Sequence, residues 1–278
     1  MTYKLLVSDL DETLLNDQGV VPQTNIEALK KAIALGVKFV PNTGRPYTTV
    51  QNLLQQLGLE EAAGQYVISY NGGIITENQG NRILSQTGLE QSLAEKIFHA
   101  GLINDQVGVH IYTLHYLYIY NLSSRDALHL QQRQIPFENL VTPSFPQIAA
   151  NDLILKVIFE STDLAVQQAV EDQVLKIVGR DNVTPSRSSN CYVEFNPPRV
   201  DKGSATLRLA SQLGIDRTEV IGVGDNNNDL SLIQAAGCGI AVQNALPEVK
   251  ACAQVVLQND NNRGALAEIV ERFILHDK

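Results

Sequence analysis

The segment EVIGVGDNNND, residues 219–229, joins a short apolar run to a dense cluster of carboxylates and amides. The apolar part is typical of a strand that is buried in a parallel sheet. The polar part does not match a dinucleotide-binding G-x-G-x-x-G, because Asn227 stands at the third glycine position. It does not match an EF-hand loop counted from Asp225, which needs glycine where Leu230 stands. A polar turn that caps a helix also fits, so other parts of the chain are needed to distinguish a turn from a site.

The first ninety residues alternate predicted strands and helices. Apolar runs predict strands at 3–8, 37–42 and 66–70, with helical periodicity between them. Gly36 and Gly58 stand where the two helices are expected to end. This order of elements implies a parallel sheet with right-handed crossovers. The same pattern returns near the C-terminus, with strands predicted at 219–223, 239–242 and 254–257.

The middle of the chain has a different character. Residues 107–121 alternate apolar and polar positions and are rich in aromatics, which favours an antiparallel hairpin. Further strands are predicted at 153–160 and 191–195, with a helix at 164–178 between them. We therefore predict an α/β fold, a Rossmann-like doubly wound parallel sheet with an inserted α+β cap domain. The core would comprise residues 1–85 and 195–278, and the cap residues 86–194.

Composition limits the classes of function. The chain has 278 residues, 44% hydrophobic and 18% charged, which is a globular balance. A net charge of −9 argues against a nucleic-acid partner, because such binding relies on Lys and Arg. No apolar stretch approaches the ~20 residues of a membrane span, and acidic residues interrupt the apolar N-terminus where a signal peptide would need an unbroken run. The cysteines, Cys191, Cys238 and Cys252, form no C-x-x-C pair. We expect a cytoplasmic protein without membrane or nucleic-acid partners.

Polar clusters follow the predicted parallel strands at equivalent points. The clusters are Asp9, Asp11 and Thr13; Thr43, Gly44 and Arg45; and Asp225, Asn228 and Asp229. Open α/β sheets bind ligands at the carboxyl ends of their strands. A single D-x-D is weak evidence for a site, but three clusters at equivalent strand ends are hard to explain as helix caps. The sequence therefore predicts an active site at this edge of the sheet.

These clusters resemble, in their order, the motifs of the haloacid dehalogenase superfamily of phosphohydrolases with an aspartate nucleophile. The matching motifs are D-x-D-x-T at 9–13, T-G-R at 43–45, Lys202 in VDKGSA, and G-D-x-x-N-D at 224–229. The position of the insert and the segment YNGG at 70–73 are similar to the Cof-type subgroup, which carries a large cap between its second and third motifs. Two departures are Glu12, where many members have glycine, and Asn42, where alanine often precedes the threonine.

The resemblance implies a Mg²⁺-dependent reaction. Asp9 would be the nucleophile, ionised at neutral pH given a reference pKa of ~3.9. One Mg²⁺ would be held by Asp9, Asp225 and the backbone carbonyl of Asp11, with water and substrate oxygens completing its coordination. Asp11 would protonate the leaving alkoxide and later deprotonate water. That role requires a pKa raised by Asp9 and by partial burial.

Other residues are expected to bind the phosphoryl group. Donors would be the amides of Leu10 and Gly44 and the hydroxyl of Thr43, and Lys202 would add a positive charge. Asn228 would hydrogen-bond the phosphate or the nucleophile, and Asp229 would orient Lys202. Arg45 is interpreted as structural. Asn71 has two readings, a hairpin turn with Gly72 and, from the resemblance, a contact near the substrate entrance.

The implied function is hydrolysis of a small phosphorylated metabolite, with sugar phosphates suggested by the family and specificity located in the cap. A sugar phosphomutase of the same superfamily is an alternative, since it shares the nucleophile and the cap style. A phospho-acceptor signalling domain is a further alternative. It is disfavoured because such domains are far shorter and lack a carboxylate two residues after the nucleophile. The sequence does not indicate an oligomeric state.

Overall fold

The structure is a computed structural model that describes residues 3–132 and 135–275. It contains two compact units, one made of residues 1–86 and 201–278 and the other of residues 87–200. The second unit extends past the predicted boundary at 194, because β11 (Tyr192–Asn196) belongs to its sheet.

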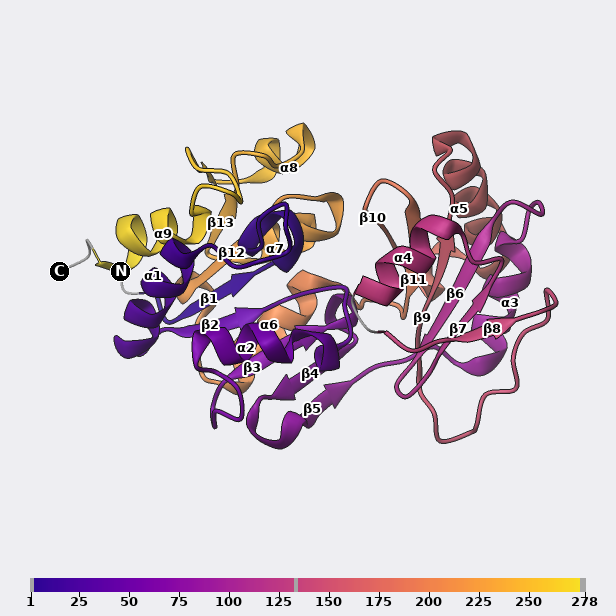
Figure 1. Ribbon diagram of the computed structural model, residues 1–278, viewed down its shortest axis with the longest axis horizontal. Coiled ribbons are helices and arrows are strands. Elements are labelled where there is room, and N and C mark those ends of the chain that lie inside the picture. Colours follow the sequence, from indigo (N-terminus) through magenta and orange to yellow (C-terminus); the bar gives the residue numbers. More distant parts are fainter. Residues whose placement is uncertain (1–2, 133–134, 276–278) are drawn as a thin grey trace. The chain divides into compact units, whose positions relative to one another are not determined.

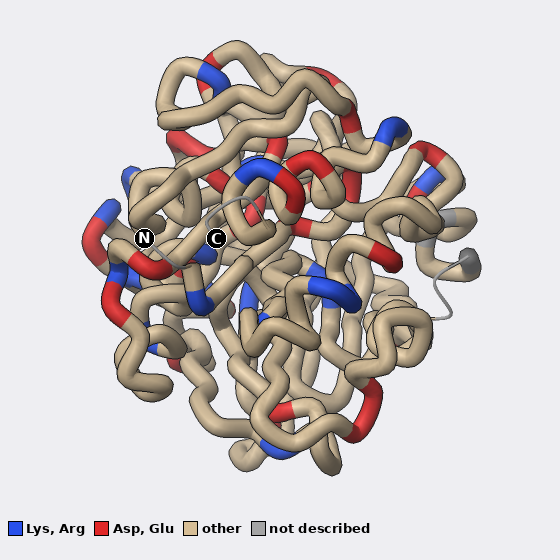
Figure 2. Tube along the Cα trace, turned by 90° about the vertical axis from the view of Figure 1, so that its left-hand side faces the viewer, with Lys and Arg blue, Asp and Glu red and all other residues tan. Residues whose placement is uncertain are grey.

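In the described parts of the chain, no helix combines the length and the apolar character that a membrane span needs. Lys and Arg lie singly or in short runs among Asp and Glu along the trace (Figure 2).

The first unit is built on a five-stranded parallel sheet (Figure 1). In sheet order, its strands are β14 (Val255–Val256), β13 (Cys238–Ala241), β12 (Val220–Gly224), β1 (Leu5–Ser8) and β2 (Lys38–Pro41). The chain adds β2 on one side of β1 and β12 on the other side, so the strand order reverses between β1 and β12. The predicted doubly wound α/β core is therefore confirmed.

Helices cover both faces of this sheet. They are α1 (Gln23–Ala34), α2 (Gln51–Leu57), α6 (Lys202–Gln212), α7 (Leu230–Ala235), α8 (Pro247–Cys252) and α9 (Ala265–Ile269). Alternate residues of a strand point to opposite faces. Accordingly, Leu6 packs with Leu29 of α1 and Leu266 of α9, whereas Leu5 packs with Leu209 of α6. The sheet is thus the middle of three layers, which leaves its strand ends as the open edge.

One predicted strand of the parallel sheet lies elsewhere. β3 (Tyr66–Ser69) forms an antiparallel sheet with β4 (Ile74–Glu77) and β5 (Arg82–Gln86). Its contact with the region of β2 is an isolated parallel bridge between Asn42 and Ile68. The Asn-Gly turn reverses the chain after β3 into a hairpin, so β3 pairs with its neighbour in sequence. The prediction that residues 66–70 form the third strand of the parallel sheet was therefore wrong, and the prediction of a hairpin turn at Asn71 and Gly72 is confirmed.

Among the described residues, the second unit contains a six-stranded sheet and the α-helices α3 (Gln91–Gly101), α4 (Ser124–Gln132) and α5 (Leu164–Val178). In sheet order, its strands are β10 (Thr184–Ser188), β11, β9 (Ile154–Glu160), β6 (Gly108–Thr113), β7 (Leu117–Tyr120) and β8 (Glu138–Leu140). Pairing is antiparallel except between β7 and β8. Apolar side chains of the inner strands pack with those of α3 and α5.

The two faces of this second sheet differ in polarity. Val157 and Val193 lie in the core under α3 and α5, so their neighbours Lys156 and Glu194 point to the other face. There the Lys156 ammonium lies 2.6 Å from a Glu194 carboxylate oxygen, with both side chains buried. Tyr192, on the same face, donates a hydrogen bond of 2.6 Å to Asp126 of α4. This face is called the polar face below.

Candidate active site

The predicted site residues gather where the strand order of the first unit reverses. Asp9 directly follows β1 and Asp225 directly follows β12. The two strands pair in parallel, with Ser8 opposite Val223. Their carboxyl ends therefore bring Asp9 and Asp225 together at the position where open α/β sheets bind ligands.

Three buried carboxylates form the centre of this site. Asp9, Asp225 and Asp229 each offer an oxygen atom within 4.8 Å of the others. The Lys202 ammonium is fully buried among them, 2.7 Å from an oxygen of Asp9 and 2.5 Å from an oxygen of Asp229. Thr13 donates a hydrogen bond of 2.7 Å to Asp225. One ammonium faces three carboxylates, so negative charge is in excess when all three are ionised.

The pKa values reflect this crowding. Burial, followed by the charge of Asp229, raises the pKa of Asp9 to about 7, although Lys202 opposes the shift. Burial and the charges of Asp229 and Asp9 raise the pKa of Asp225 to about 9. Burial disfavours the charged form of Lys202, but the carboxylates of Asp229 and Asp9 outweigh it and raise its pKa above the ordinary value. A cation beside Asp9 and Asp225 would relieve the repulsion.

The donor set fits a hard divalent cation such as Mg²⁺. Carboxylate oxygens are the ligands that Mg²⁺ prefers, and it needs only a few of them from the protein. One oxygen of Asp229 contacts Lys202 and the other accepts hydrogen bonds of 3.0 Å from the amides of Asp225 and Asn226. Asp9 and Asp225 are therefore the members of the cluster with capacity to bind a metal. Asp229 lies where the predicted orienting contact with Lys202 requires it.

The side chain of Asp11 does not join the cluster. It is 43% exposed and forms an ion pair with Arg45, in which the Arg45 Nε lies 2.8 Å from one carboxylate oxygen and an Nη contacts the other. A non-helical turn follows, in which Glu12 has a φ of 57°. Arg45, interpreted from the sequence as structural, is thus the ionic partner of the predicted general acid.

Comparison with known proteins identifies the family. A sequence model described as haloacid dehalogenase-like hydrolase matches residues 6–270. The chain belongs to this family. YxeH of Bacillus subtilis, which is named as a phosphatase, is 34% identical over 275 residues, covering 98% of this chain and 99% of its own length. YwtE of the same organism, named as a 5-amino-6-(5-phospho-D-ribitylamino)uracil phosphatase, is 27% identical over 284 residues, covering 94% of this chain and 95% of its own.

Solved structures agree with this assignment. The crystal structure of a haloacid dehalogenase-like hydrolase from Bacteroides thetaiotaomicron has a TM-score of 0.80 at 27% identity, covering 98% of this chain and 99% of that one. The predicted family, Cof-type haloacid dehalogenase, is confirmed, and so is the prediction of an enzyme, a phosphoric monoester hydrolase, at the level of this family.

The remaining predicted residues of this haloacid dehalogenase-like hydrolase lie around the acidic cluster. Thr43 is buried, and its hydroxyl accepts a hydrogen bond of 3.1 Å from the Arg45 amide. The side chain of Leu10 lies in the hydrophobic core, which leaves its backbone amide as the group that can serve a ligand. The Asn228 Oδ1 is buried and has no hydrogen-bond partner among the described residues. Such an acceptor suits a cation or a substrate hydroxyl.

Asn42 is a positioning residue that the sequence did not reveal. Its side-chain amide donates hydrogen bonds of 3.0 Å to the Lys202 carbonyl and 3.1 Å to the Thr206 hydroxyl, and it is fully buried. It therefore ties the end of β2 to the first turn of α6, which carries Lys202. The sequence showed that Asn42 replaces the alanine common in the family. Its contacts could not be predicted from this, because Lys202 and Thr206 are distant in sequence.

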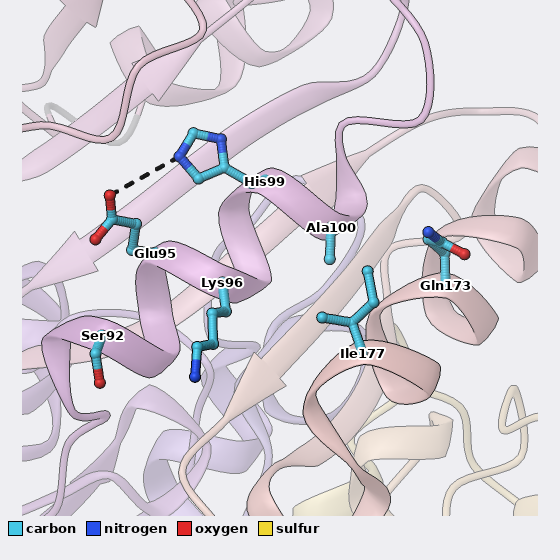
Figure 3. Close-up of a pocket in the computed structure, with 7 residues that line it drawn as sticks. All are labelled: Ser92, Glu95, Lys96, His99, Ala100, Gln173 and Ile177. Atoms are coloured by element: carbon cyan, nitrogen blue, oxygen red, sulfur yellow. Dashed lines mark ion pairs between the residues drawn. The ribbon is translucent and has the colours of Figure 1, made fainter.

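The second unit of the hydrolase has a surface hollow of about 470 Å³ between α3 and α5 (Figure 3). Its lining consists of Ser92, Glu95, Lys96, His99, Ala100, Gln173 and Ile177. Glu95 and His99 lie 4.0 Å apart, and both side chains are more than half exposed. No predicted site residue is among the seven, and they combine no nucleophile with a buried acid or base, so the chemistry is assigned to the acidic cluster.

Proposed function

We propose that this protein is a Mg²⁺-dependent phosphatase that hydrolyses small phosphate monoesters, sugar phosphates or related metabolites, through a phosphoaspartyl intermediate on Asp9. The observation that carries the proposal is the buried Asp9 at the reversal of strand order, paired with Lys202 and next to Asp225. YwtE is named for a phosphorylated ribitylamino compound, which supports a polyol or sugar phosphate. The location in the cytoplasm and the absence of nucleic-acid and membrane partners stay predictions from composition.

In the first half-reaction, an oxygen of Asp9 forms a bond to phosphorus and the ester oxygen leaves with the bonding pair. Asp11 gives its proton to that oxygen, so a neutral alcohol departs. In the second half-reaction, Asp11 removes a proton from water, whose oxygen attacks the same phosphorus. The bond to Asp9 breaks, which releases phosphate and regenerates the carboxylate.

The surrounding residues would bind the charge of the phosphoryl group. Lys202 is held by Asp229 and faces Asp9, so its charge is available to the phosphoryl oxygens. The amides of Leu10 and Gly44 and the Thr43 hydroxyl would donate to the same oxygens, and Asn228 would contact the phosphate or the nucleophile. Asp9, Asp225 and, from the family resemblance, the Asp11 carbonyl would hold Mg²⁺. When bound, Mg²⁺ neutralises charge on the nucleophile and the phosphoryl oxygens.

A screen of phosphorylated metabolites tests this function. Purified protein is incubated with Mg²⁺ and each ester, and free phosphate and positional isomers of hexose phosphates are measured. Release of free phosphate supports hydrolysis. Isomerisation without release would instead indicate the phosphomutase, and no reaction with any ester, including p-nitrophenyl phosphate, would overturn the proposal.

Metal removal is expected to lower the activity by at least about tenfold, because nucleophile and substrate are both anions. Mg²⁺ should restore activity and Ca²⁺ should restore less, since Ca²⁺ prefers more ligands at longer distances. The measurement is the hydrolysis rate after exhaustive chelation and after addition of each ion. Full activity in the chelated protein would contradict the metal site.

The same experiment has a pH readout. Metal binding requires ionised Asp9 and Asp225, whose pKa values are raised to about 7 and about 9. A raised carboxyl pKa means that protons occupy the metal-free site below that pH. The apparent affinity for Mg²⁺ should therefore rise with pH from 6 to 9 with release of protons. Calorimetry in buffers of different ionisation enthalpy measures this release.

The second unit is proposed to govern the choice of ester, since every residue with a proposed chemical role lies in the first unit. Tyr192 and Arg187, in neighbouring strands of this unit, lie on opposite faces of its sheet. Arg187 contacts Glu171 and Gln168 of α5 at 2.9 and 2.8 Å, whereas Tyr192 lies on the polar face. Because Arg187 is bonded to α5, we propose Tyr192 as the specificity residue and use Arg187 as a matched control.

Tyr192→Phe is expected to change the ratio of kcat/KM values between esters by roughly tenfold, because a lost polar contact discriminates between substrates. Arg187→Gln should leave that ratio unchanged. Neither variant should change the affinity for Mg²⁺. The measurement is kcat/KM on several sugar phosphates together with a metal titration. Unchanged ratios in Tyr192→Phe, or a shifted affinity for Mg²⁺, would contradict the proposal that the second unit sets specificity while the first unit binds the metal.

A further inference from the structure

The turn Tyr70–Gly72 after β3 has an unusual backbone. Its three residues, Tyr70, Asn71 and Gly72, have φ values of 51°, 54° and 99°. Glycine adopts such values freely, but a bulky side chain rarely does. Tyr70 and Asn71 are also buried, at 4% and 2% exposure. Strained residues persist where the surrounding structure holds them in place, and they gather at functional sites.

The strained turn is bonded to the segment proposed to bind phosphate. The backbone N–H of Asn71 donates a hydrogen bond of 3.0 Å to the Thr43 carbonyl, and the backbone N–H of Tyr70 donates one of 3.2 Å to the Arg45 carbonyl. These two bonds lie on either side of Gly44. The turn therefore fixes both neighbours of the residue whose amide is proposed to meet the phosphoryl group.

The side chain of Asn71 also lies against Gly44. A Cβ atom on Gly44 would lie 3.1 Å from the Asn71 Oδ1 and 3.6 Å from its Cγ. The absence of a side chain at Gly44 therefore makes room for the side-chain amide of Asn71. Through this contact Asn71 limits how far the Gly44 backbone can move.

The other side of the turn packs on the helix that carries Lys202. A Cβ atom on Gly72 would lie 2.4 Å from the Asp201 carbonyl oxygen and 2.8 Å from the Ala205 Cβ. Only glycine allows the turn to approach the first turn of α6 so closely. The same three residues thus contact the phosphate-binding segment and the start of the helix from which Lys202 reaches Asp9.

We propose that the strained turn Tyr70–Gly72 positions the phosphate-binding groups and that Asn71 is a positioning residue for the Gly44 amide. The side chain of Asn71 holds Gly44 where its amide meets the phosphoryl oxygens, and the positive φ of Tyr70 and Asn71 directs that side chain inward. This inference rests on the proposed phosphatase function and deepens it, since it identifies a residue that sets the affinity for the phosphoryl group.

Two variants separate this role from a role in folding. Asn71→Gly removes the side chain at a φ that glycine adopts without strain. Relief of this strain offsets the larger chain entropy of glycine in the unfolded state, so the melting temperature should stay close to that of the parent. Asn71→Asp keeps the shape but places a carboxylate beside Gly44, where it repels an anion. Both are expected to lower kcat/KM and to raise the inhibition constant of inorganic phosphate by roughly 10- to 100-fold. Asn81→Gly is the matched control, because Asn81 also has a positive φ, 47°, and has no proposed role.

The measurements are kcat and KM on p-nitrophenyl phosphate, phosphate inhibition and thermal unfolding. Stable Asn71 variants with weakened phosphate binding support the inference, provided that Asn81→Gly behaves as the parent. Parent-like kinetics in both Asn71 variants overturn it. So does a loss of activity in Asn71→Gly that accompanies unfolding while folded Asn71→Asp binds phosphate normally. If the parent protein itself hydrolyses no ester, the phosphatase proposal fails, which is distinct from an active parent with unaffected variants.

Discussion

Asp9→Asn is expected to abolish turnover, by at least ~10⁴-fold, because an amide cannot act as the nucleophile toward phosphorus. The fold should persist. Asn has nearly the same shape as Asp, and Lys202 keeps its contact with Asp229 at 2.5 Å. Burial and Asp229 raise the pKa of Asp9 to about 7, well above its unfolded value. Ionisation of Asp9 therefore costs stability as pH rises toward 7, and the full penalty is present above pH 7.

Because the substitution removes this penalty, Asp9→Asn should melt at or above the temperature of the parent when both are compared above pH 7. The measurements are the single-turnover rate on p-nitrophenyl phosphate and thermal unfolding. Asp105→Asn is the control, because Asp105 is exposed in the second unit and has no proposed role. A folded Asp9→Asn protein that still turns over would mean that another residue is the nucleophile.

The placement of Asp9 and Asp225 could be predicted from the sequence, because it follows from local pattern and topology. Each residue ends an apolar run, and parallel strands bring such ends to one edge. The third strand was misplaced because an apolar run at 66–70 does not show which partner it takes. The Asn-Gly turn gave β3 an antiparallel neighbour in β4, and local pairing prevailed.

Side-chain partners were less predictable than backbone positions. The ion pair between Arg45 and Asp11 depends on the direction in which each side chain leaves its turn, which spacing does not show. The same holds for the contact of Asn71 with Gly44, since it requires a left-handed backbone at a residue that is not glycine. Lys202 was identified from motif order, but its complete burial between two carboxylates comes from packing of α6.

The ion pair of Arg45 with Asp11 bears on the chemistry. A guanidinium favours the ionised form of a carboxyl group, whereas a general acid must carry a proton when the ester bond breaks. To act as the proposed general acid, Asp11 would have to leave Arg45 when the substrate binds. Its side chain is 43% exposed, so exchange with solvent and a change of rotamer are both open to it. We expect the substrate phosphate to compete for Arg45.

Asp11→Asn is expected to slow hydrolysis of a sugar phosphate by roughly 10²- to 10⁴-fold, the span for loss of a positioned general acid–base. The defect in the phosphorylation step should be smaller with p-nitrophenyl phosphate, because p-nitrophenolate leaves without a proton whereas a sugar alkoxide needs one. Single-turnover kinetics on both esters measure that step. Glu12→Gln is the control, since Glu12 is the adjacent, exposed carboxylate. Equal defects on the two esters would show that Asp11 is not the general acid. Its role would then be to hold Arg45 or the local turn in place.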